Sequence, residues 1–170
     1  AKISNSLTIV WETTYNANNL DDFAKGIAID GSGQLWLTGV TTHSTQGKNI
    51  TTLRINTSGA IQSTLTVNGS FNGNDEGMDV VVDASNNAYV ACYQTISSTN
   101  SDFYTVKYNS SATKIWEKFT DGYSQLDQAT NIALDSLNNV IVAGSSEIST
   151  GSLVYLTTQL VQQDVKDPVD

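Results

Sequence analysis

The sequence predicts an all-β protein built from three similar repeats, each of which forms a small antiparallel sheet. A pattern of strand, tight turn and strand occurs three times, and its turn aspartates, Asp30, Asp83 and Asp135, stand 53 and 52 residues apart. Two further strand-like segments, rich in β-branched and aromatic residues, follow this pattern in the first two repeats. No amphipathic helical period is present, and the only proline is Pro168.

Each repeat opens on a short apolar strand, expected at 27–29, 80–82 and 132–134. Apolar residues on both faces of such a strand indicate burial on both faces, as in a sheet packed between two others. An aspartate ends the strand and can accept backbone N–H bonds from the turn. Three residues later stand Gly33, Asn86 and Asn138, the residue types that best tolerate positive φ. The same hairpin turn is therefore predicted three times.

A second strand follows each turn, and a third strand follows a polar loop. Second strands are expected at 35–37, 88–90 and 140–142, third strands at 53–55, 106–108 and 156–160, and fourth strands at 61–67 and 115–120. The third repeat lacks a fourth strand, but residues 7–15 read as one, because Trp11 aligns with Trp116. We expect this N-terminal strand to complete the last sheet.

Four short strands in a repeat of about 52 residues are typical of a β-propeller blade. We expect β-propeller repeats over residues 1–163, with a C-terminal tail at 164–170 and with blades at 16–67, 68–120 and 121–163, the last completed by 7–15. A closed propeller usually has about four to eight blades. Three arrangements stay open: further blades in a longer chain, two copies in one six-bladed ring, or three blades that close alone. An open arc would leave two apolar blade faces that need cover.

The repeat resembles the SBBP (seven-bladed β-propeller) repeat family of secreted and surface bacterial proteins. The resemblance rests on Asp22–Gly39, on Val106–Asn109 and on Ile115–Glu117, and it covers nearly the whole chain. It implies a propeller fold and a secreted or cell-surface location. The third repeat departs from the pattern because it lacks the outer strand. The motif residues are scaffold residues, so the resemblance implies no particular activity.

Composition and charge argue against several classes of partner. The net charge is −9, with 17 acidic and 8 scattered basic residues, which argues against nucleic acid and against anionic membrane surfaces. No apolar run approaches the roughly 20 residues of a membrane-spanning helix. Cys92 is the only cysteine, so no intrachain disulfide can form. It replaces Gly39 and Gly144 of the other repeats, which indicates a small buried residue and not a nucleophile.

Three aspartates share one repeat position just before the inner strand: Asp22, Asp75 and Asp127. In a propeller they would lie on one rim of the central channel. Three carboxylates there could bind a hard cation such as Ca²⁺, a sugar or a basic peptide. Alternatively, each could accept backbone hydrogen bonds that hold its loop in place. No catalytic residue and no other cofactor are expected.

The sequence favours a non-catalytic extracellular or cell-surface module that binds a glycan or protein partner, because variable polar loops on a rigid frame are where binding specificity usually lies. Further blades, from the same protein or from a second copy, are expected partners too. A secreted hydrolase or lyase that uses the rim carboxylates is one alternative. A structural spacer or assembly subunit is the other.

Overall fold

The computed structural model describes residues 1–161, and their regular structure is all β. The first sheet contains β3 (Asp22–Ile29), β4 (Leu35–His43), β5 (Gly47–Ile55) and β6 (Ile61–Val67). The second contains β7 (Glu76–Val82), β8 (Ala88–Thr95), β9 (Ser101–Tyr108) and β10 (Lys114–Thr120). The third contains β11 (Asp127–Leu134), β12 (Val140–Ser149) and β13 (Ser152–Leu160). The expected tail and the end of the expected domain at 163 lie outside the described residues, so that division stays a prediction.

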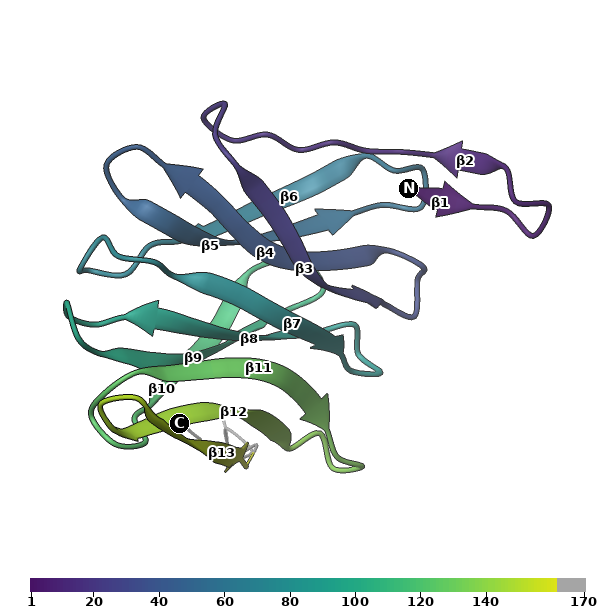
Figure 1. Cartoon of the computed structure of the whole chain (residues 1–170). Coiled ribbons are helices and arrows are strands. Elements are labelled where there is room, and N and C mark those ends of the chain that lie inside the picture. Colours follow the sequence, from purple (N-terminus) through teal and green to yellow (C-terminus); the bar gives the residue numbers. More distant parts are fainter. Residues whose placement is uncertain (162–170) are drawn as a thin grey trace, which may run out of the picture.

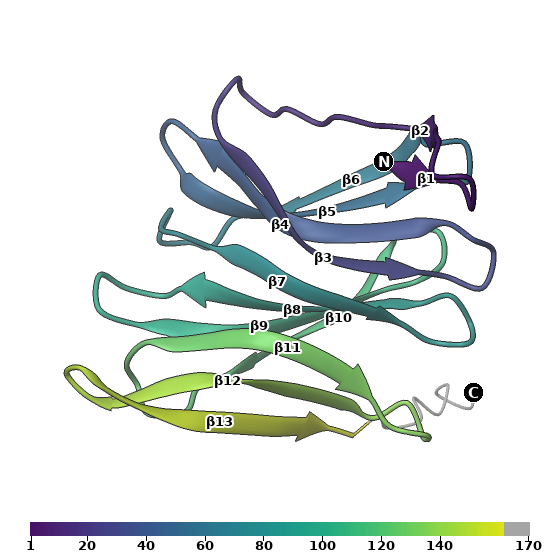
Figure 2. The same cartoon turned by 45° about the vertical axis from the view of Figure 1, so that its right-hand side comes forward.

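The three sheets follow one another in chain order, with their first strands side by side (Figure 1). Every strand pair within a sheet is antiparallel. Figure 2 shows that the loops gather at one edge of the stack and the tight turns at the other. We call the first edge the loop rim; it comprises residues 16–21, 44–46, 68–75, 96–100, 121–126 and 150–151. The opposite edge, the turn rim, comprises residues 30–34, 56–60, 83–87, 109–113 and 135–139.

The three expected hairpin turns are confirmed. In the first turn, Asp30 Oδ1 accepts the N–H groups of Ser32 and Gln34, both at 2.9 Å. Asp83 and Asp135 accept the equivalent pairs of N–H groups in the other two turns. The positions expected to have positive φ do so, at 80° for Gly33, 65° for Asn86 and 60° for Asn138. The turn chemistry alone was therefore sufficient to predict the local backbone.

Each inner strand carries one extra residue, and a close contact with its neighbouring strand follows. The register of β3, β7 and β11 shifts at Lys25, Met78 and Thr130, which marks a β-bulge in each. Beside the bulge of β3, a Cβ on Gly39 would collide with the backbone carbonyl of Phe23. Cys92 takes the equivalent place opposite Gly77 and is fully buried, as expected. Burial raises the pKa of the Cys92 thiol well above its ordinary value, which suits a packing residue.

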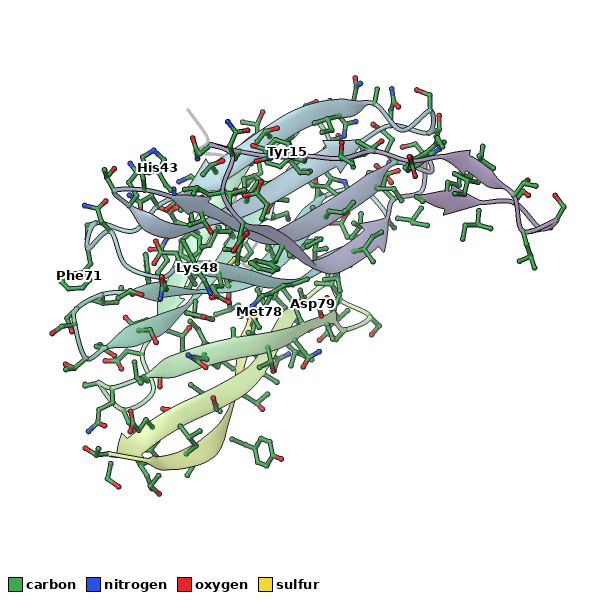
Figure 3. The ribbon with its side chains drawn as sticks, turned by 45° about the horizontal axis from the view of Figure 1, so that its top comes forward. Tyr15, His43, Lys48, Phe71, Met78 and Asp79 are labelled. Carbon is green, nitrogen blue, oxygen red and sulfur yellow. The ribbon has the colours of Figure 1, made fainter. Side chains whose placement is uncertain are left out.

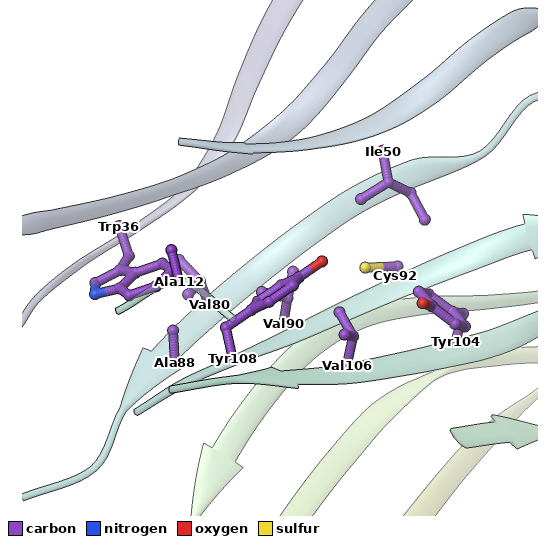
Figure 4. Close-up of a cluster of buried hydrophobic side chains, with 10 residues drawn as sticks. All are labelled: Trp36, Ile50, Val80, Ala88, Val90, Cys92, Tyr104, Val106, Tyr108 and Ala112. Carbon is purple, nitrogen blue, oxygen red and sulfur yellow. The ribbon is translucent and has the colours of Figure 1, made fainter. Parts of the chain in front are cut away.

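Two apolar cores hold the sheets together. Between the first and second sheets, Trp36 and Ile50 pack with residues of the second sheet that include Val80 and Tyr108 (Figure 4). The Trp36 and Tyr108 rings stack with their centroids 6.4 Å apart. The second core contains buried residues of the second and third sheets, among them Tyr89, Phe103, Ile132, Val140 and Val142. Each sheet is thus packed by apolar side chains against the next.

The outer faces of the end sheets are open. Ile27 is 62% exposed, whereas its repeat equivalents Val80 and Ile132 are 2% and 6% exposed. The prediction that this inner strand is buried on both faces is therefore wrong for residues 27–29, because no sheet of residues 1–161 packs against the outer face of β3. It is also wrong for Ala133, which is exposed. At the other end Tyr155 is 99% exposed, although the equivalent Phe103 is fully buried. The two uncovered faces match those expected for an open arc.

The N-terminal segment covers part of the first sheet and does not join the third. β2 (Ile9–Trp11) pairs with β1 (Lys2–Ile3), so the expected completion of the last sheet by residues 7–15 is not observed. Trp11 Nε1 donates to the Thr57 carbonyl at 3.0 Å. Residues just after Trp11 enclose a pocket of about 230 Å³ against the first sheet. The segment therefore packs on the first sheet of the described residues.

We predict that Gly39→Ala destabilises the fold by about 2–3 kcal/mol, because the new methyl group would push the two strands apart at the bulge. Urea-induced unfolding measures the change. Cys92→Ala is the matched control, since its position in the second sheet already accommodates a Cβ. Equal losses for the two variants would contradict the packing described here.

Candidate functional site

The three predicted aspartates stand at the loop rim, Asp75 within it and Asp22 and Asp127 directly after it. Each closes the loop that enters an inner strand. Each accepts a backbone N–H from five or six residues earlier. The donors are Ala17 for Asp22 at 2.7 Å, Gly69 for Asp75, and Gly122 for Asp127 at 2.5 Å. This shared bond supports the alternative in which these residues hold the loops in place.

Asp75 has the contacts of a structural anchor. It is fully buried, and its second oxygen accepts the N–H of Thr95 at 2.8 Å. Burial raises the pKa of the Asp75 carboxyl, and the bonds from Gly69 and Thr95 partly oppose that rise. Because both oxygens already have backbone donors, little capacity is left for a ligand.

Asp127 differs from Asp75, although it is equally buried. Its Oδ1 atom has no hydrogen-bond partner among residues 1–161. Beside it lie Asp102 of β9 and Asp121 of the β10–β11 loop, and one carboxylate oxygen of each residue lies within 4.8 Å of the others. Burial, followed by the charges of Asp121 and Asp127, raises the pKa of Asp102. This is the only group of three such ligands in the described part of the chain, so the structure does not bring Asp22, Asp75 and Asp127 together.

Sequence reasoning missed Asp102 and Asp121. Tyr108 and Ile55 are equivalent, because they pair with the first residues of β8 and β4. Asp102 and Asn49 each stand six residues before them. Asp121 directly follows β10 as Asn68 directly follows β6, so the repeat equivalents of the two acids are Asn49 and Asn68. A search for acids that all repeats share cannot find residues that are acidic in one repeat and amides in another. The signal for both residues is a difference between repeats, since each acid of the second repeat replaces an asparagine of the first.

An ion network joins the first two sheets beside this rim. Glu76 of β7 is 8% exposed and accepts hydrogen bonds from Lys25 and from Lys48, the latter at 2.7 Å. Burial alone would raise the pKa of the Glu76 carboxyl, but the two lysines outweigh it and lower the pKa below its ordinary value. Tyr93 and Asp75 are the other titratable groups beside it, and burial together with the Glu76 charge raises the pKa of Tyr93.

Exposed apolar side chains stand on the same rim. Two of them are aromatic: Phe71 is 47% exposed and Tyr123 is 57% exposed. Each follows within two residues a glycine whose N–H is bound by a rim aspartate. Phe71 lies at the loop edge, as Figure 3 shows. The other exposed apolar residues of this rim and of the adjoining end of β12 are Leu20, Ile96, Leu126 and Ile148.

Comparisons with known proteins assign no family. No model of a protein family matches the chain, and no curated protein matches it. Among solved structures, the chain is similar to a catalytically inactive variant of virginiamycin B lyase from Staphylococcus aureus, solved with quinupristin. The TM-score is 0.33 and the identity 13%, and the match covers 83% of this chain and 57% of the other. This likeness assigns no activity. Within residues 1–161, no helix is long and apolar enough to span a membrane.

We predict that Glu76→Gln lowers the free energy of unfolding by about 1 kcal/mol near pH 6.5, because it removes the charge between two lysines. The folded-state pKa of Glu76 lies below its ordinary value of 4.5. Its contribution is therefore complete above that pH and declines as the pH falls below it. Urea unfolding of both proteins at pH 6.5 and pH 3 measures this. A difference between wild type and variant that stays constant over this range would contradict the assignment.

Proposed function

We propose that this chain is a non-catalytic β-propeller module of a secreted or cell-surface protein, and that its loop rim binds a glycan or protein partner. The observation that carries the proposal is the pair of exposed aromatic residues on anchored loops. Phe71 and Tyr123 each follow a glycine held by a buried aspartate. Aromatic side chains on preordered loops lose little freedom on binding, and they supply large apolar contact area.

The buried aspartates support this role better than a catalytic one. Asp75 and Asp127 are both fully buried, and each accepts a backbone N–H. A general acid or base must come within hydrogen-bond distance of its substrate. The hydrolase or lyase alternative would therefore need carboxylates other than Asp75 and Asp127.

We predict that Phe71→Ala and Tyr123→Ala each weaken binding to the partner at least tenfold, which is the effect of a central aromatic contact. A glycan array and a pull-down from extracellular extract identify the partner, and surface plasmon resonance then measures affinity. Leu137→Ala is the control, because Leu137 is 75% exposed on the turn rim. Full affinity in both aromatic variants, or an equal loss in the control, would contradict binding at the loop rim.

A second role, assembly through the open sheet faces, has its own support. Tyr155 is 99% exposed where the equivalent Ile50 and Phe103 are fully buried against a following sheet. Ile27 is likewise exposed where Val80 and Ile132 are buried against a preceding one. The face that carries Tyr155 therefore corresponds to the faces that pack against a following sheet, and the face that carries Ile27 corresponds to those that pack against a preceding one. Further repeats or a second copy would cover both faces.

We predict that the 170-residue chain associates as its concentration rises, and that Tyr155→Lys reduces this association by placing a charge on one open face. Sedimentation velocity over a range of concentrations measures both proteins. Lys118→Ala serves as a control outside the two faces. A strict monomer at every concentration would contradict assembly of this chain with itself.

A further inference from the structure

We propose that Asp102, Asp121 and Asp127 form a divalent-cation site, suited to Ca²⁺, that links the second sheet to the third at the loop rim. Asp102 belongs to β9, Asp127 begins β11, and Asp121 lies on the loop between β10 and β11. These strands and the loop meet at one edge of the stack (Figures 1 and 2). This inference does not rest on the proposed recognition role, since it concerns other side chains.

The backbone brings the three residues together and holds them there. Ser101 pairs with Leu126 in an isolated parallel bridge, so the start of β9 lies against the residue that precedes β11. Ser101 Oγ also donates to the Asp127 carbonyl at 3.0 Å. On the loop, the N–H of Ser124 donates to Asp121 Oδ1 at 2.7 Å. The carboxylates are therefore positioned before any ion arrives.

The spacing of the carboxylate oxygens fits a calcium ion. One oxygen of each residue lies within 4.8 Å of the other two. Ca²⁺ binds oxygens at about 2.3–2.6 Å in a flexible geometry, so two ligands on opposite sides of the ion stand about 5 Å apart. Ca²⁺ takes about six to eight oxygen ligands, so three carboxylates leave positions for water or for a ligand from the solvent.

Buried oxygens without partners provide an independent sign that something binds here. Ser146, opposite Asp127 on β12, is fully buried, and its Oγ has no hydrogen-bond partner among the described residues. A Cβ on Gly122 would lie 2.5 Å from Ser146 Oγ and 3.0 Å from Asp127 Oδ2, so both oxygens border one small space. Asp127 Oδ1 is also buried and without a partner, but Asp22 Oδ1 is so too, and Ser146 Oγ is therefore the observation that distinguishes this junction. Buried oxygens normally have a partner, and a bound cation would supply one.

The charges of the cluster are uncompensated. None of the three acids belongs to an ion pair of residues 1–161, in contrast to Glu76 between its two lysines. Like charges at this separation repel each other, most strongly where the site is partly buried. A divalent cation would turn that repulsion into attraction and would bring the two sheets together.

The equivalent junction between the first and second sheets is an internal comparison. There the three positions are Asn49, Asn68 and Asp75, which together carry one carboxylate in place of three. The oxygens of that carboxylate are bonded by Gly69 and Thr95. The same backbone therefore folds with two amides in place of two acids. The cation site is confined to the junction that has all three carboxylates.

This comparison supplies a variant that should fold. Asp102→Asn combined with Asp121→Asn gives the second junction the residues of the first. Asp21→Asn is the charge control, because Asp21 is exposed on another part of the loop rim. Each protein is treated with a chelator, and CaCl₂ is titrated into it in a calorimeter. We expect one Ca²⁺ per chain for wild type and for the control, and none for the double variant.

Thermal unfolding separates lost binding from lost folding. Ca²⁺ should raise the Tm of wild type and of Asp21→Asn, but it should leave that of the double variant unchanged. In excess chelator the double variant should be at least as stable as wild type, because it lacks the repulsion between carboxylates. Absence of Ca²⁺ binding by wild type at millimolar concentration would overturn the proposal. Binding by the double variant with wild-type affinity would overturn it too, whatever the loop aromatics bind.

Discussion

The structure depends on one constraint: each sheet has two apolar faces, and both must be covered. Tyr89 and Phe103 of the second sheet bury themselves against Ile132 and Val142 of the third. The second sheet is covered on both sides, and its strands β8 and β9 are almost entirely buried. Within residues 1–161, the first and third sheets each pack against another of the three sheets on one side only. The position of the N-terminal segment, the pocket beneath it and the exposed Tyr155 all follow from this imbalance.

Local features of the chain could be predicted because they depend on residues close in sequence. The positive φ at Asn86 and Asn138 could be predicted from turn chemistry, because these asparagines occupy the turn position that Gly33 has in the first repeat. The exposure of Ile27 could not be predicted in the same way. Its residue type matches that of Ile132, which is buried against the second sheet, but no sheet of residues 1–161 packs on Ile27 in the same way. The path of residues 7–15 likewise depends on contacts between residues far apart in sequence, such as the bond from Trp11 to Thr57.

In the candidate sites, residues that occur in every repeat have a different role from residues that occur in only one or two repeats. Asp22, Asp75 and Asp127 recur because every repeat needs its entering loop closed, and the structure gives all three the same backbone bond. Features that occur in one or two repeats are better indicators of function. Asp102 and Asp121 replace two asparagines, and Phe71 and Tyr123 extend from loops of different length. The proposed cation site and the proposed binding rim are therefore both marked by residues that differ between repeats, and not by the residues that all repeats share.

Amide hydrogen exchange tests the packing of the sheets most directly. β4, β8 and β12 each have a strand on both sides, so their backbone hydrogen bonding is alike, and they differ in how far their faces are covered. In dilute solution, we predict that the amides of β8 exchange most slowly and that those of β4 and β12 exchange faster. Equal protection of the three strands, or greatest protection in β12, would contradict it.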